Sequence, residues 1–187
     1  MRIIGGELKG STLYLPENKE TRPLKDISRE SIFNLLMHSN KFSFEIKNSI
    51  VLDLYAGTGS FGLECLSRQA SKVCFVERSI NVIPILEKNI KKLKLIEKSE
   101  ILNDDIFKLN IKKNTFNSKF NLIFCDPPFK DKDTSNLIDL ISNNKLLESN
   151  GIIILHKNKN NNDKYPNFFN IIDERIYGIS KIIFGKF

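Results

Sequence analysis

Short apolar runs alternate with stretches of helical spacing along most of this chain, and no other sequence feature constrains the fold as strongly. The runs at 50–55, "IVLDLY", and 72–77, "KVCFVE", are typical of buried strands, whereas 80–95 has the spacing of a helix. We expect strands at 50–55, 72–77, 99–105, 121–126 and 151–157, and helices at 60–70, 80–95 and 134–147, with a short helical piece from residue 106. Strands that alternate with helices form a mostly parallel α/β sheet covered on both faces, and ligands bind beyond the carboxyl ends of its strands.

The two ends of the chain depart from this alternation. Residues 2–15 contain two glycine-bearing turns and are expected to form a hairpin or extended arm, and 26–39 has the spacing of a helix. The last apolar runs, at 168–177 and 180–187, predict an antiparallel C-terminal hairpin around Gly178. We therefore expect one compact unit, in which residues 1–40 form an N-terminal arm and helix and residues 41–187 form the main domain.

Composition narrows the class of protein. The chain has 187 residues, and its content of 41% hydrophobic and 27% charged residues is ordinary for a soluble globular protein. We expect a cytoplasmic protein without a membrane span or secretory signal, in which Cys65, Cys74 and Cys125 are reduced and buried. A net charge of +7 favours a polyanionic partner such as nucleic acid, although an AT-rich genome that enriches lysine would produce the same bias.

A glycine-rich segment, "DLYAGTGSFG" at 53–62, follows the first expected strand. Gly57, Gly59 and Gly62 fit the G-x-G-x-x-G pattern of nucleoside-binding loops, and Glu77 ends the next strand where a ribose-binding acid is expected. Asp53 would repel a pyrophosphate but suits a ligand that carries ammonium and sulfonium charges, as S-adenosylmethionine does. Two simpler interpretations stay open: Asp53 as a helix cap or turn residue, and Glu77 as a solvated strand end.

A second cluster, Asp126-Pro127-Pro128-Phe129, ends the strand at 121–126. The prolines stop the strand because they cannot donate to the sheet ladder. The Asp126 carboxylate and the Pro127 carbonyl can accept hydrogen bonds from an exocyclic amine of a base, and Phe129 offers a face for stacking a flipped base. A strand-ending turn beside a core phenylalanine is the alternative interpretation.

The segments "MRIIGGELKG", "TRPLKDISRESIFNLL", "LDLYAGTGSFGLECLSR" and "DPPF" together resemble the class I S-adenosylmethionine-dependent methyltransferases, and in particular the RsmD-like family of bacterial 16S rRNA guanine-N2 methyltransferases. This resemblance implies a Rossmann-like fold with a seven-stranded, mostly parallel sheet, S-adenosylmethionine as cofactor without a metal, and a monomer that acts on 16S ribosomal RNA, either naked or within an assembling small subunit. By resemblance, the cofactor-binding residues are Asp53, Ala56, Gly57, Thr58, Gly59, Glu77 and Asp105; the residues at the target base are Asp126, Pro127, Pro128 and Phe129; and the RNA-binding residues are Lys9, Arg22, Lys25 and Arg29.

Several alternatives remain at this point. The same motifs fit an adenine-N6 methyltransferase acting on DNA or RNA, a non-catalytic RNA-binding module, or, less well, a nicotinamide oxidoreductase. Arg29 can equally pair with an acid on its own helix. His156 and Lys157 stand where the family resemblance implies an acidic or neutral strand end, and we expect His156 to be structural rather than a general base.

Overall fold

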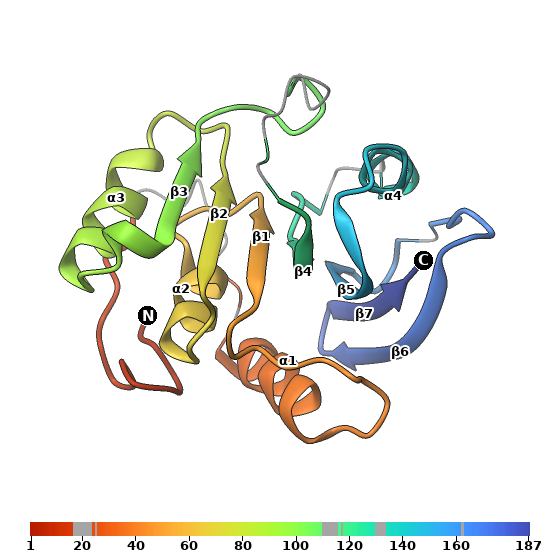
Figure 1. Cartoon of the computed structure of the whole chain (residues 1–187), viewed down its shortest axis with the longest axis horizontal. Coiled ribbons are helices and arrows are strands. Elements are labelled where there is room, and N and C mark those ends of the chain that lie inside the picture. Colours follow the sequence, from red (N-terminus) through yellow and green to blue (C-terminus); the bar gives the residue numbers. More distant parts are fainter. Residues whose placement is uncertain (17–23, 25, 110–115, 117, 130–133, 162) are drawn as a thin grey trace.

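A seven-stranded sheet forms the centre of the protein in the computed structural model, which describes residues 1–16, 24, 26–109, 116, 118–129, 134–161 and 163–187. The strand order is β3-β2-β1-β4-β5-β7-β6 (Figure 1). The strands are β1 (Ile50–Leu54), β2 (Lys72–Val76), β3 (Ser99–Leu102), β4 (Phe120–Cys125), β5 (Leu147–Asn158), β6 (Asn170–Tyr177) and β7 (Ser180–Lys186). The helices are α1 (Asp26–His38), α2 (Ser60–Ser67), α3 (Ile83–Lys92), α4 (Thr134–Asn143) and the short 3₁₀ helix η1 (Ile96–Lys98).

The pairing of the strands confirms the expected mostly parallel sheet with an antiparallel C-terminal hairpin. Strands β3, β2, β1, β4 and β5 pair in parallel, and β7 pairs antiparallel with both β5 and β6. Parallel neighbours need a crossover between them, and α2, α3 and α4 lie in three of these crossovers. The carboxyl ends of β1, β2 and β4 therefore lie side by side at one edge of the sheet.

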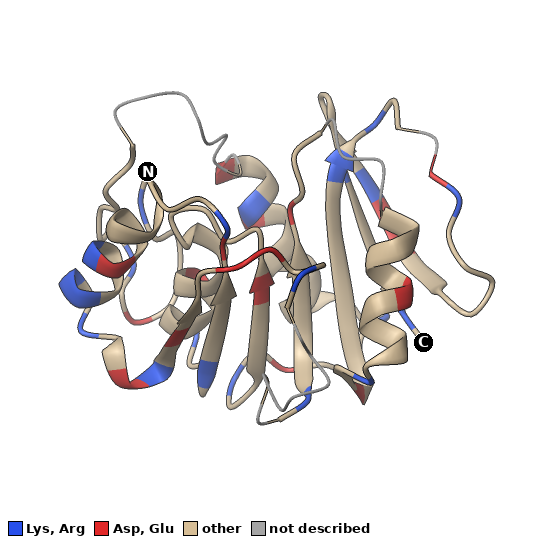
Figure 2. Cartoon of the chain, turned by 90° about the horizontal axis from the view of Figure 1, so that it is seen from above, with Lys and Arg blue, Asp and Glu red and all other residues tan. Residues whose placement is uncertain are grey.

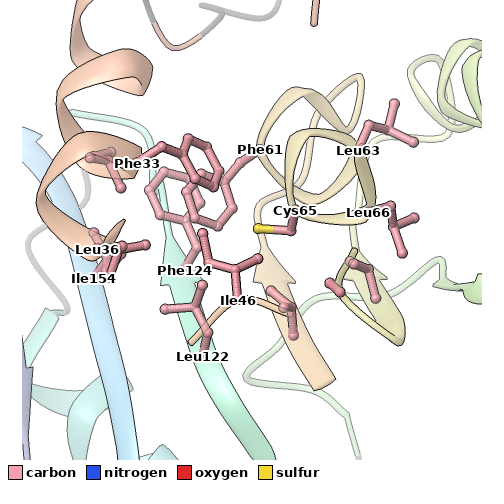
Figure 3. Close-up of a cluster of buried hydrophobic side chains, with 14 of the residues drawn as sticks. Phe33, Leu36, Ile46, Phe61, Leu63, Cys65, Leu66, Leu122, Phe124 and Ile154 are labelled. Carbon is pink, nitrogen blue, oxygen red and sulfur yellow. The ribbon is translucent and has the colours of Figure 1, made fainter. Parts of the chain in front are cut away.

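Apolar side chains fill both faces of the sheet, as expected for buried parallel strands. One hydrophobic cluster joins α1, α2 and α3 to the sheet, and a second joins α4 to the opposite face. In the first cluster, Phe61 of α2 stacks between Phe33 of α1 and Phe124 of β4, at ring-centroid distances of 5.1 and 3.8 Å (Figure 3). This stack ties the N-terminal helix to the strand that carries the Asp126 cluster.

Some expected element bounds are wrong, for local reasons. Helix α4 ends at Asn143 because Lys145 adopts a left-handed φ of 53°, and β5 begins at Leu147, where it pairs with Phe120 across a register shift. The short helix expected from residue 106 is a turn, in which the Asp105 carboxylate accepts a hydrogen bond from the Phe107 amide. Ile27, an apolar residue of the helix expected at 26–39, is 70% exposed and so does not belong to the buried face of α1.

The N-terminal arm folds back on itself as an irregular hairpin, in which the Ile3 amide donates to the Ser11 carbonyl at 2.9 Å and the Leu13 amide to the Met1 carbonyl at 3.0 Å. Its two limbs meet through an isolated bridge between Arg2 and Thr12, and its Ile3 and Leu13 are buried in the same cluster as α2 and α3. Cys65, Cys74 and Cys125 are buried free thiols, as predicted. Among the residues that the structure describes, no helix has both the length and the apolar character needed to cross a membrane.

Candidate active site

The predicted cofactor residues and the predicted base-binding residues meet at the carboxyl edge of the sheet. Strand β1 pairs with β2 on one side and with β4 on the other. Asp53 lies opposite Phe124, so the Asp126 cluster begins next to the point where β1 enters the glycine loop. The Asp126 amide donates to the Leu54 carbonyl at 3.4 Å and so extends this pairing beyond the end of the strand. The topology brings the two motifs together although 63 residues of sequence lie between Gly62 and Asp126.

The glycine loop turns sharply through residues with left-handed backbone. Tyr55, Gly57 and Gly59 have φ values of 59°, 56° and 81°. Such values cost little for glycine but are strained for tyrosine. The sequence pattern did not predict a left-handed backbone at Tyr55. A Cβ atom on Gly57 would have no neighbour within 4 Å among the described residues, which leave open space beside the loop at this position. This is the kind of space that a ligand approaching the backbone requires.

Glu77 holds the loop in place. Its Oε2 accepts a hydrogen bond from the Gly57 amide at 2.8 Å, and its Oε1 accepts from the Ser79 amide at 2.7 Å. The side chain is buried, so the interpretation of Glu77 as a merely solvated strand end is wrong. The carboxylate is fixed by two amide donors and retains lone pairs that can accept further hydrogen bonds.

Asp53 of β1 is buried beneath the loop and contacts the first turn of α2. Its Oδ2 accepts a hydrogen bond from the Gly62 amide, in the first turn of that helix, at 2.9 Å. The N-cap residue of α2 is Gly59, so the interpretation of Asp53 as the helix-cap residue is wrong; its carboxylate instead accepts from a first-turn amide while Asp53 itself belongs to β1. Burial raises the pKa of the Asp53 carboxyl well above its ordinary value of 3.8; the Gly62 hydrogen bond opposes this shift, and Asp126 and Glu77 add to it by charge repulsion. The three carboxylates form an acidic site that favours a positively charged ligand.

The remaining predicted cofactor residues are Ala56, Thr58 and Asp105. Ala56 and Thr58 are buried in the loop, where the Ala56 amide donates to the Val76 carbonyl at 3.1 Å. Asp105 follows β3, is partly exposed, and pairs with Arg78 at 3.2 Å. The carboxylate of this predicted cofactor-binding residue therefore already has a cationic partner.

Asn89 of α3 is a further residue at this site, which the sequence analysis missed. Its Nδ2 donates to the Thr58 carbonyl at 3.0 Å and to the Tyr14 carbonyl at 3.2 Å, while its Oδ1 accepts from the Tyr14 amide at 2.7 Å. The fully buried side chain thus joins the N-terminal arm to the glycine loop. In the sequence, this role could have been inferred only from the position of a polar residue on the apolar face of an amphipathic helix.

The Asp126 cluster forms a small platform at the end of β4. Pro127 is buried, Pro128 is exposed, and Asp126 and Phe129 are partly exposed. The Asp126 Oδ1 atom lies 2.7 Å from Nδ1 of His156, which lies in β5 directly after the residues that pair with β4. The His156 ring meets the Phe129 ring edge-on at a centroid distance of 5.4 Å. His156 is therefore in direct contact with two residues of the predicted base site.

The predicted RNA-binding residues have different outcomes. Lys9 is exposed on the N-terminal arm, and Arg22 and Lys25 lie outside the described residues. Arg29 is fully buried, where it bonds to the Arg2 carbonyl and pairs with Asp26 at 3.0 Å. Its guanidinium cannot reach an RNA phosphate from this position, so that prediction is corrected in favour of pairing on its own helix.

A family model described as "Conserved hypothetical protein 95" matches residues 1–186. The chain is 33% identical, over 96% of its length and 90% of the relative, to "Ribosomal RNA small subunit methyltransferase D" of Haemophilus influenzae. It is 32% identical, over 86% of its length and 76% of the relative, to the protein of that name in Escherichia coli.

Solved structures match over nearly the whole chain. The candidate methyltransferase yhhF of Escherichia coli has a TM-score of 0.81 at 27% identity and covers 99% of this chain and 96% of its own. The candidate methylase HI0767 of Haemophilus influenzae has a TM-score of 0.76 at 32% identity, and the match covers 98% of this chain and 96% of that protein. The expected class I methyltransferase fold is thereby confirmed.

Proposed function

We propose that this chain, which belongs to the RsmD family (the family whose model is described as "Conserved hypothetical protein 95"), transfers a methyl group from S-adenosylmethionine to small-subunit ribosomal RNA. The observation that carries the proposal is the meeting of the glycine loop and the Asp126 cluster at the ends of the paired strands β1 and β4. The glycine loop fits the methyl donor, and the Asp126 cluster fits the nitrogen that receives the methyl group.

The chemistry of the site fits the cofactor. When bound, S-adenosylmethionine supplies an electrophilic methyl group on a positively charged sulfur. Burial is the main cause of the raised pKa of Asp53, and the charges of Asp126 and Glu77 add to it, so a cationic ligand would stabilise the charged carboxylates. Glu77 would accept hydrogen bonds from the ribose hydroxyls, while the open space beside Gly57 admits the ligand to the loop backbone.

The acceptor is best explained as an exocyclic amine, and we infer guanine N2. The lone pair of such an amine is delocalised into the base, so the nitrogen needs positioning more than it needs a strong base. The Asp126 carboxylate and the Pro127 carbonyl would accept its N–H groups, and Phe129 would stack on the base. The rigid Asp-Pro-Pro backbone would hold these acceptors in a fixed geometry.

RNA would be held in part by the N-terminal segment. We infer that residues 1–40 act as an RNA-binding extension of the domain at 41–187, with Lys9, Arg22 and Lys25 near phosphates. The exposed Lys9 supports this assignment for the arm.

The decisive experiment is methylation of small-subunit RNA in vitro, followed by mass mapping of its nucleosides. We expect the RNA treated in vitro to contain N2-methylguanosine at one position. The same modification should be absent from the RNA of a strain in which the gene is deleted. N6-methyladenosine in its place would identify the adenine-N6 alternative. If NADP raises the melting temperature and S-adenosylhomocysteine does not, the methyltransferase assignment is wrong.

Replacement of Asp126 tests the acceptor site within this function. Asp126→Ala should lower the single-turnover rate by about 10²-fold or more, the scale of removing one preorganised polar group. Asp126→Asn keeps a carbonyl acceptor and should retain more activity than the alanine variant. Calorimetry with S-adenosylhomocysteine serves as the control, because the glycine loop and Glu77 are unchanged in both variants.

A further inference from the structure

The geometry points to His156 as a positioning residue for Asp126: its Nδ1–H holds Asp126 Oδ1 and leaves Oδ2 as the oxygen that accepts the target amine. This inference rests on the proposed function, since it assigns a role within the same base site. His156 itself would touch neither the cofactor nor the base, and it would act through Asp126 and Phe129.

The hydrogen bond fixes where the imidazole proton lies. An ionised carboxylate only accepts hydrogen bonds, so the 2.7 Å contact between Asp126 Oδ1 and His156 Nδ1 needs a proton on Nδ1. Nε2 is buried and has no hydrogen-bond partner among the residues that the structure describes. A ring nitrogen enclosed in this way offers no route for a proton to a substrate. His156 therefore suits positioning and not general-base catalysis.

The two partners differ in exposure, which separates their roles. The His156 side chain is 6% exposed, whereas that of Asp126 is 20% exposed. The imidazole is thus enclosed by protein, while the carboxylate still borders the open carboxyl edge of the sheet. With Oδ1 bonded to a buried ring, rotation of the carboxylate is restricted and Oδ2 is the oxygen left for an incoming N–H group.

The scaffold beneath His156 is rigid. Strand β5 is an interior strand, with Leu155 opposite Cys125 of β4 and His156 itself opposite Ile182 of β7. The Asp-Pro-Pro-Phe segment, by contrast, has left the sheet. His156 reaches it at both ends, through the bond to Asp126 and the edge-on contact with Phe129. A ring carried by a strand that pairs with β7 at this position would thereby orient both the acceptor oxygen and the stacking face.

A matched pair of substitutions tests this role. His156→Asn places an amide N–H near the position of Nδ1, whereas His156→Leu keeps apolar bulk and removes the donor. We expect His156→Leu to lower the single-turnover methylation rate roughly tenfold or more, the scale expected when a partner that orients an active-site group is removed. His156→Asn should recover most of that loss. Affinity for S-adenosylhomocysteine should be unchanged in both variants.

A purely structural role predicts the opposite order, because leucine fills a buried site better than asparagine does. An unchanged rate in His156→Leu, or an equal loss in both variants, would overturn the proposal. In an Asp126→Ala background, His156→Leu should cause a clearly smaller loss than it does in the wild type, because the hydrogen bond to Asp126 is already gone and only the edge-on contact with Phe129 remains to be lost. An additional tenfold loss there would also contradict it.

A spectroscopic readout separates this inference from the proposed function. The chain has 2 histidines, so ¹⁵N imidazole spectra are readily assigned with a His38→Gln variant. We expect the Nδ1–H form for His156 and a change of its signals in Asp126→Ala. Absence of methylation by the wild-type protein would refute the proposed function alone. An unprotonated Nδ1, or signals insensitive to Asp126→Ala, would refute the positioning role even if methylation occurs.

Discussion

At the scale of single residues, two glycines of one motif perform different tasks. Gly57 lies beside open space with a left-handed φ of 56°, so it allows close approach of a ligand. Gly62 lies in the first turn of α2, where an added Cβ would be 2.3 Å from Cε1 of Phe75 and 2.7 Å from Cγ1 of Val73. Gly62 therefore allows close packing of α2 against β2.

Alanine substitutions should separate these tasks. Gly62→Ala should lower the free energy of unfolding by about 1–3 kcal/mol through overpacking, with little change in cofactor affinity once the protein is folded. Gly57→Ala should cost about 1–2 kcal/mol of backbone strain and should also weaken S-adenosylhomocysteine binding. Urea denaturation and calorimetry measure the two effects. Equal loss of affinity in both variants would contradict the assignment.

The buried Asp53 predicts a pH-dependent stability. Burial raises the pKa of the Asp53 carboxyl in the folded protein well above 3.8. At pH values between 3.8 and that raised pKa, the folded protein therefore binds more protons than the unfolded chain does. Stability of the cofactor-free protein should therefore fall as the pH rises through that window. Asp53→Asn removes this penalty and keeps an acceptor for the Gly62 amide.

Thermal unfolding of the wild type and of Asp53→Asn, measured without cofactor across that window, tests the expectation. The variant should gain stability relative to wild type as the pH rises, and it should bind S-adenosylhomocysteine more weakly. A stability difference that is independent of pH would show that Asp53 does not titrate in this way.

At the scale of elements, Glu64 fastens the N-terminal arm to α2. Its two carboxylate oxygens accept hydrogen bonds from the amides of Ile4 and Gly5, each at 2.8 Å. The same carboxylate pairs with Arg68 at 3.0 Å and lies 4.0 Å from the guanidinium of Arg29. Burial lowers the pKa of Arg29, and the charges of Glu64 and Asp26 oppose that shift.

Glu64→Ala should accordingly destabilise the protein by about 3–5 kcal/mol, because it leaves the buried Arg29 short of a counter-charge and frees two arm amides. Glu100→Ala is the matched control: its pair with Lys72, at 2.6 Å, is partly exposed and should be worth less than about 1 kcal/mol. Urea denaturation compares the two. Similar small losses in both variants would show that the arm does not depend on Glu64.

At the scale of the whole molecule, the net charge of +7 does not gather on one element. Figure 2 shows lysine and arginine, in blue, spread over helices, strands and loops, with aspartate and glutamate, in red, among them. Figure 1 places the arm and α1 on the same side of the molecule as α2 and α3. RNA binding through the arm would therefore rest on a few named cations.

Salt dependence measures the contribution of those cations. Lys9→Ala combined with Arg22→Ala should reduce the slope of log affinity against log salt by about 0.7–0.9 for each phosphate that is no longer neutralised. Lys72→Ala, which removes a lysine already paired with Glu100, should leave the slope unchanged. A slope that stays constant in the double variant would place the RNA on another surface.

The sequence by itself determined the order of elements and the two motifs, because helix spacing, strand runs, glycines and prolines are local properties of the chain. It placed Asp53, Glu77 and Asp126 at strand ends, and the paired strands then brought these ends together. Only the tertiary structure decided which polar groups share an environment. Glu64 accepts a hydrogen bond from the amide of Ile4, 60 residues away in the sequence, and His156 contacts Asp126, 30 residues away. No periodic pattern in the sequence predicts either contact. Arg29 is buried for the same reason: its exposure depends on the arm and α2 that cover it, and no pattern within α1 contains them.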